Sequence, residues 1–213
     1  MNDKSKKGVF AMIKITNILF LIAIFSTVPS ALFSAEKVEG ITTKTAVIFN
    51  TLCAKCHEGE CSGRLSFNTG SRAAYGHIKR YAEDINISEE ETEGFFTLLN
   101  HMKKECELLM PDTKKWKLEN LSRFALPSHK SYFIPLGILK NGNYHLTIET
   151  EEKALFRVEV ISDHFDPYLD KSVCPDQKEQ ILAFSVDKSI NAFLRIRSRK
   201  ALHIVTLEVK LKK

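Results

Sequence analysis

Cys53, Cys56 and His57 stand together in the five-residue stretch Cys-Ala-Lys-Cys-His. The pattern C-x-x-C-H is the attachment site of c-type haem. The two thiols form thioethers with the haem vinyl groups, and the histidine binds the iron as proximal ligand. The spacing is short because both sulfurs must reach one porphyrin edge while the imidazole reaches its centre. The stretch therefore predicts one covalent haem c, attached at Cys53 and Cys56 and ligated by His57.

A C-x-x-C pair also occurs in zinc sites and in redox dithiols. A zinc site usually needs a second ligand pair, and the sequence has neither a second C-x-x-C nor an H-x₃₋₅-H. A thioredoxin-like motif needs a surrounding βαβ pattern, which we do not find. Haem attachment is therefore the preferred interpretation.

Residues 1–35 are typical of a secretory signal. Four lysines precede an uninterrupted apolar run at residues 18–25, and small residues follow at Ser34 and Ala35. The run is shorter than the ~20 residues of a membrane-spanning helix. We therefore expect cleavage near residue 35, no stable membrane span afterwards, and export to the periplasm or an equivalent compartment, where haem is attached to such proteins.

The charge of the remaining chain is nearly balanced. The sequence has 31 Lys and Arg residues and 26 Asp and Glu residues. Four of the basic residues and one of the acidic residues lie in the expected signal, which leaves a net charge near +2. No basic stripe with interleaved aromatic residues is present, so nucleic acid is not an expected partner. No hydrolase, zinc-protease or nucleotide-binding motif is present either, so we predict no catalytic residue and no turnover enzyme.

A helical pattern extends from residue 40 to about residue 110. Ser88 and Glu91 form a capping box, which predicts a helix from about residue 89 to 106. Its apolar residues recur at steps of three and four and so share one face. This stripe consists of Phe95, Leu99, Met102 and Cys106.

From about residue 131, apolar residues alternate with polar ones. About six such segments follow in 80 residues, and Asn141-Gly142 is a hairpin turn signal. The segments cover residues 132–136, 144–148, 156–160, 182–186, 192–196 and 205–211. This pattern is typical of an antiparallel β-sandwich, with residues 111–130 as a linker. The expected fold class is therefore α+β: an N-terminal all-α haem domain over residues 36–110, followed by a sandwich over residues 131–213.

The first half resembles the cytochrome c family. The resemblance covers residues 40–110 and rests on Phe49 one helical turn before Cys53, on the C-x-x-C-H motif, and on the later amphipathic helix. It implies a cytochrome c-like domain in which the first and last helices cross beside the haem. The sequence departs from the family at Thr45, where a glycine is common. It also lacks a methionine between His57 and the later helix, where the axial ligand usually lies.

The sequence therefore leaves four candidate side chains for the sixth iron ligand. The remaining alternative is that the sixth position has no protein ligand. Met110, followed by Pro111, would give a high-potential electron carrier. Cys106 ends the apolar stripe, and His77 lies in a middle helix that the apolar spacing predicts over residues 71–83. His101 lies off the stripe and is expected in solvent.

The five cysteines bear on this choice. Haem attachment uses two, which leaves Cys61, Cys106 and Cys174. In an oxidising compartment two of these normally pair. Pairing of Cys61 with Cys174 would leave Cys106 as a thiol that a ferric iron could ionise. Alternatively, Cys106 pairs with Cys61 or is a small buried residue.

The stretch from Tyr81 to Cys106, followed by the strand-rich half, is similar to the small monohaem cytochromes of anaerobic ammonium-oxidising bacteria. Members of that family form heterodimers, have His/Cys-ligated haem, and bind nitric oxide and carbon monoxide. The resemblance implies His57 and Cys106 as axial ligands, a low potential, a gas-binding or redox-sensing function, and a homologous partner subunit. The alternative function is an electron-transfer cytochrome within a larger redox complex.

Overall fold

The structure is a computed structural model. It describes residues 40–57, 71–82, 85–112, 116–173 and 177–212. The expected signal at residues 1–35 lies outside the described residues, as do Cys61 and Cys174. Residues 37–213 form one compact unit. Among the helices of the described part, none is both long enough and apolar enough to cross a membrane.

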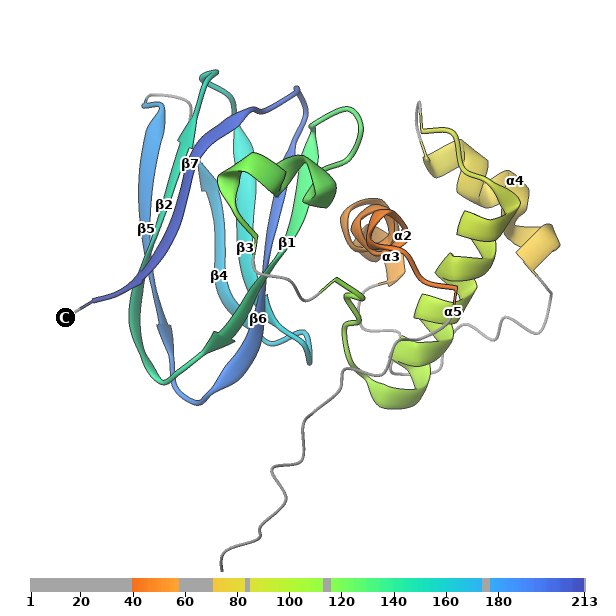
Figure 1. Cartoon of the computed structure of the whole chain (residues 1–213), viewed down its shortest axis with the longest axis horizontal. Helices are drawn as coiled ribbons and strands as arrows, with labels where there is room; N and C mark the ends of the chain where they lie inside the picture. The colour runs from red at the N-terminus through yellow and green to blue at the C-terminus, as the bar shows by residue number, and fades with distance from the viewer. Residues whose placement is uncertain (1–39, 58–70, 83–84, 113–115, 174–176, 213) are drawn as a thin grey trace, which may run out of the picture. The chain divides into compact units, whose positions relative to one another are not determined.

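Among the described residues, seven antiparallel strands form two sheets (Figure 1). One sheet has the order β1-β6-β3-β4 and the other the order β5-β2-β7. The strands are β1 (Ser131–Leu139), β2 (Gly142–Thr150), β3 (Phe156–Ser162), β4 (Pro167–Val173), β5 (Glu179–Val186), β6 (Ile190–Ser198) and β7 (Ile204–Leu211). Along β2 the apolar side chains of Tyr144, Leu146 and Ile148 are buried and alternate with more exposed polar ones. The β-rich half thus has seven strands instead of the expected six or so.

Six helical segments precede the strands in the part of the chain that the structure describes. They are α2 (Thr43–Ile48), the π-helix η1 (Phe49–Cys53), α3 (Ala54–His57), α4 (Ser71–Tyr81), α5 (Glu89–Glu105) and the 3₁₀-helix η3 (Leu118–Phe124). The first three follow one another without a break. The Ser88 hydroxyl accepts a hydrogen bond from the Glu91 N–H, and the Glu91 carboxylate accepts one from the Ser88 N–H. The predicted capping box is thereby confirmed.

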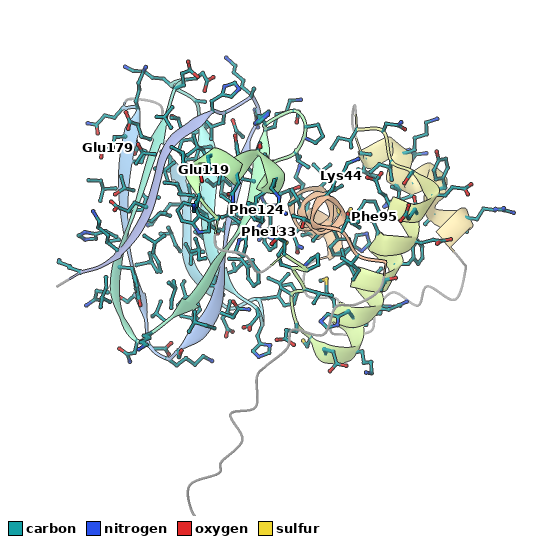
Figure 2. All side chains as sticks on the ribbon, in the orientation of Figure 1. Lys44, Phe95, Glu119, Phe124, Phe133 and Glu179 are labelled. Atoms are coloured by element: carbon teal, nitrogen blue, oxygen red, sulfur yellow. The ribbon has the colours of Figure 1, made fainter. Side chains whose placement is uncertain are left out.

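The continuous run of α2 and η1 is enclosed on several sides. All seven residues from 45 to 51 are buried. Helix α2 contacts α5 and η3, while η1 contacts β1 and β6. Figure 2 shows Phe95 on one side of this run and Phe124 and Phe133 on the other. A helix that is buried all round must have neighbours on every face, and here strands supply some of them.

The expected all-α cytochrome c-like domain over residues 36–110 is wrong. The described helices are few, and they share one hydrophobic core with the two sheets. The physical reason is that η1 packs against β1 and β6, where a separate helical domain would need further helices. Residues 111–130, which we expected to be a linker, contain η3. Its Leu121 and Phe124 are buried in the hydrophobic core.

Gly94 sets the approach of α5 to the N-terminal helix. A methyl group added at its Cα would lie 2.9 Å from the Thr45 Cγ2 and 3.0 Å from the Gly40 carbonyl oxygen. Both distances are shorter than a normal van der Waals contact. A side chain at this position would therefore push α5 away from α2.

We predict that Gly94→Ala lowers the free energy of unfolding by about 1–2 kcal/mol, because the added methyl overpacks this contact. The matched control is Gly76→Ala in α4, where an added methyl meets nothing within 4 Å. That change should raise stability by about 0.4–1 kcal/mol, because alanine restricts the unfolded chain. Urea denaturation of both variants checks the pair, and equal effects would contradict the close approach at Gly94.

A charged network is buried on the strand side of η1. Arg195 on β6 is 1% exposed and Glu159 on β3 is 6% exposed. The Arg195 Nε and Nη2 donate to the two carboxylate oxygens at 2.9 and 3.1 Å, and Arg197 donates to the same carboxylate. The Arg195 Nη1 also donates to the Asn50 carbonyl at 3.5 Å. This last contact joins the sheet to the π-helix.

The two arginines determine the ionisation of Glu159. Burial alone would raise the pKa of Glu159, but the hydrogen bonds and charges of Arg195 and Arg197 outweigh it and hold the pKa below its ordinary value. The stabilisation is therefore complete above the pKa of an unfolded glutamate, about 4.3. It is lost as the pH falls through the lower pKa of the folded state.

Glu159→Gln should lower the free energy of unfolding by roughly 3–5 kcal/mol at pH 7, because it leaves buried arginine charge uncompensated. The variant should also lose less stability than the wild type between pH 5 and pH 3, a range set by the unfolded pKa of about 4.3. Glu208→Gln on β7 is the control, since its pair with Lys210 is solvent-exposed and should contribute less than about 1 kcal/mol. Denaturant titrations at several pH values test this. Equal losses for the two variants would refute the assigned role of Glu159.

Candidate functional site

The C-x-x-C-H residues lie on the wall of one cavity. Cys53 at the end of η1, together with Cys56 and His57 on α3, lines a space of about 780 Å³, its opening to solvent included. Most other lining residues are apolar and come from four helical segments. Its mostly apolar walls with a few polar groups are those of a small-molecule or cofactor pocket.

The π-helix η1 positions Cys53. The Ala54 N–H bonds to the Phe49 carbonyl, five residues back, which widens the helix by one residue. The Asn50 side-chain amide donates to the Ala46 carbonyl at 2.9 Å, and the Thr51 hydroxyl donates to the Val47 carbonyl at 2.7 Å. These side chains satisfy buried carbonyl groups where the hydrogen-bond register changes. The altered register fixes the direction in which Cys53 leaves the helix, and such π-turns often occur at functional sites.

The two cysteines of the motif are both thiols in the structure. Burial raises the pKa of the Cys53 thiol to about 12, and the neighbouring Cys56 adds to the shift. Cys56 is exposed. The site therefore offers two unpaired sulfurs, one inside the apolar cavity and one at its surface.

His57 has a second histidine near it. Its ring centre lies 6.2 Å from that of His77 on α4, and the two ring planes are inclined by 76°. Both histidines line the cavity. The His77 ring also lies 4.8 Å from the Tyr81 ring.

Cys106 does not fit the role of thiolate ligand. It is disulfide-bonded, it is exposed, and it does not line the cavity. Helix α5 ends at Glu105, and Cys106 follows in a left-handed conformation with φ of 57°. The expected apolar stripe therefore ends at Met102, because the chain turns away at Cys106. A sulfur in a disulfide carries no thiolate, so the structure does not support the expected His57/Cys106 pair.

The other candidate ligands differ in whether they line the cavity that contains His57. Met110 is 5% exposed and belongs to the hydrophobic core, and it does not line the cavity. His101 is partly buried on α5, which differs from the expected exposure, and it does not line the cavity either. All four candidates lie in the described part of the chain. Only His77 shares the cavity with His57.

Sequence reasoning missed two features of the site. The π-turn has no sequence signature that we can identify. The contact of Arg195 with Asn50 joins residues 145 positions apart, so no local pattern reveals it. The one signal for His77 was its place in an expected helix over residues 71–83, which the structure confirms as α4 (Ser71–Tyr81).

Comparisons with known proteins give no family for this chain. No family model matches it, and a search of curated proteins finds no match. A solved structure described as "CBM4 structure and function" is similar over 38% of this chain and 73% of its own, at 12% identity and a TM-score of 0.31. A similarity this distant carries no argument about function.

The two thiols should differ in reactivity in the haem-free chain. Thiolate is the reactive form, and burial of Cys53 suppresses it. We predict that iodoacetamide at pH 8 modifies Cys56 more than tenfold faster than Cys53, the order expected from a Cys53 pKa raised well above the usual value of about 8.5. Trypsin cleaves after Lys55, so Cys53 and Cys56 lie on different peptides, and fragment spectra separate Cys56 from Cys61 on the second peptide. In urea the rates should become similar, and similar rates without urea would contradict the burial of Cys53.

Proposed function

We propose that this chain carries one haem c, attached at Cys53 and Cys56 and ligated by His57, and that it is an exported one-electron redox protein. The observation that carries the proposal is the meeting of two free thiols and an imidazole on one wall of an apolar cavity. Bound there, the haem would supply reversible one-electron chemistry at its iron.

The residues of the cavity suit this cofactor. Thioether formation needs two reduced sulfurs, and neither Cys53 nor Cys56 is in a disulfide. Apolar side chains such as Phe49, Phe95 and Leu99 line the space. They would exclude water from a porphyrin, and a low-polarity shell is one of the means by which a protein sets a haem potential.

The disulfide at Cys106 supports export. Structural disulfides persist in oxidising compartments and are rare in the cytosol. The presence of an oxidised Cys106 and reduced Cys53 and Cys56 in one chain would be explained if haem attachment removes the latter two from disulfide chemistry. The proposed location is therefore the periplasm or an equivalent compartment.

Electron transfer is the first candidate role, and its partner would be another redox protein or a homologous subunit. Binding of nitric oxide or carbon monoxide, as implied by the resemblance, depends on a Cys106 thiolate that leaves the iron on reduction. The disulfide at Cys106 removes that route. The low-potential His/thiolate mechanism is therefore not carried forward.

The proposal predicts that export in a host with a haem c maturation system gives a protein heavier than the processed chain by one haem. A Cys53→Ser, Cys56→Ser double variant should lose covalent haem completely, because no sulfur remains to form a thioether. Intact-mass spectrometry and the pyridine haemochrome spectrum measure this.

Cys106→Ser is the matched control, since it removes a cysteine that does not line the cavity. It should retain one haem per chain, even if loss of the disulfide lowers stability by about 2–5 kcal/mol. A colourless wild-type protein, or a double variant that still carries covalent haem, would overturn the proposed function.

A further inference from the structure

We propose that His77 is the second axial ligand of the haem iron, so that the iron lies between the imidazoles of His57 and His77. This inference rests on the proposed function and extends it to the sixth ligand. Of the four candidate side chains, His77 alone lines the cavity on which the C-x-x-C-H motif lies. The other three belong to the core, to α5 away from the cavity, or to a disulfide.

The spacing of the two rings is that of two imidazoles on one metal. A metal–imidazole bond is about 2.0 Å long, and the ring centre lies about 1.1 Å beyond the ligating nitrogen, so the ring centres on opposite sides of one metal lie roughly 6 Å apart. The observed separation is 6.2 Å.

Other ring pairs that include a histidine in the described residues are 4.8 to 6.2 Å apart. The His77–Tyr81 centres lie 4.8 Å apart, and the His129–His203 centres lie 5.4 Å apart. The His129–Tyr132 centres are also 6.2 Å apart, so the separation of His57 and His77 is compatible with two ligands of one iron, and their shared cavity carries the inference. The 76° inclination of the rings is compatible with axial ligation, because imidazoles on the two faces of a porphyrin can take any relative rotation.

Helix α4 holds His77 beside the cavity. Tyr81 lies one helical turn further on the same helix face, and its ring packs against the imidazole. Ala74 and Ile78 line the cavity from the same helix. The α4 segment thus contributes both an apolar wall and a nitrogen ligand, while α3 supplies the other ligand.

Two imidazole ligands determine the character of the haem. The iron would be six-coordinate and low-spin in the ferric state, with no open position for a gas. The potential would lie below that of a His/Met haem, because a methionine ligand raises it. Both properties suit an electron carrier.

The test uses the purified, haem-loaded full chain and its His77→Ala variant. His77 is exposed in the structure, so its truncation should leave the fold intact. The wild type should give low-spin ferric optical and EPR spectra. The variant should retain covalent haem, convert to high-spin spectra, and return to low-spin when free imidazole is added.

His101→Ala is the matched control, because His101 lies outside the cavity, and its spectra should equal those of the wild type. His77→Met should restore a low-spin haem with a higher midpoint potential. A low-spin spectrum that persists in His77→Ala, or a high-spin wild type, would overturn His77 as ligand while leaving haem attachment intact. A wild type without covalent haem would instead refute the proposed function itself.

Discussion

Complete burial of residues 45–51 is the constraint from which the rest of the site follows. Seven consecutive buried residues on a helix leave no face for solvent. The chain meets this requirement by placing α5 against α2 and the strands β1 and β6 against η1. Because the run of buried residues ends at Thr51, the motif that follows leaves the core at the cavity formed with α4 and α5.

Enclosure creates a second requirement, since buried polar groups need partners. The side chains of Asn50 and Thr51 return hydrogen bonds to carbonyl groups one turn earlier. Arg195 reaches the Asn50 carbonyl from the sheet while Glu159 neutralises its charge. The same helix that carries the thiols is thus held from the sandwich side by a charged network. This coupling explains how so short a helical segment can maintain a defined geometry.

Local sequence patterns predicted many of the helices and strands. The features that they did not predict depend on long-range packing. The capping box at Ser88 and most strands could be predicted, because each depends on neighbouring residues. Strand β4 was missed since only Leu169 and Val173 are buried along this edge strand, which leaves no alternation to detect. Cys106 fits a helical stripe by spacing, yet the helix stops one residue earlier and the chain turns left-handed. The replacement of an all-α domain by helices packed on strands depends on contacts such as η1 with β6, which no local period encodes.

The central claim is that this protein holds a haem by two covalent bonds in the stretch from Cys53 to His57. Proteolysis of the exported protein followed by mass spectrometry of that peptide tests it most directly. The account predicts a peptide that carries the mass of one haem on its two cysteines. A peptide whose cysteines are both unmodified and open to alkylation would contradict it.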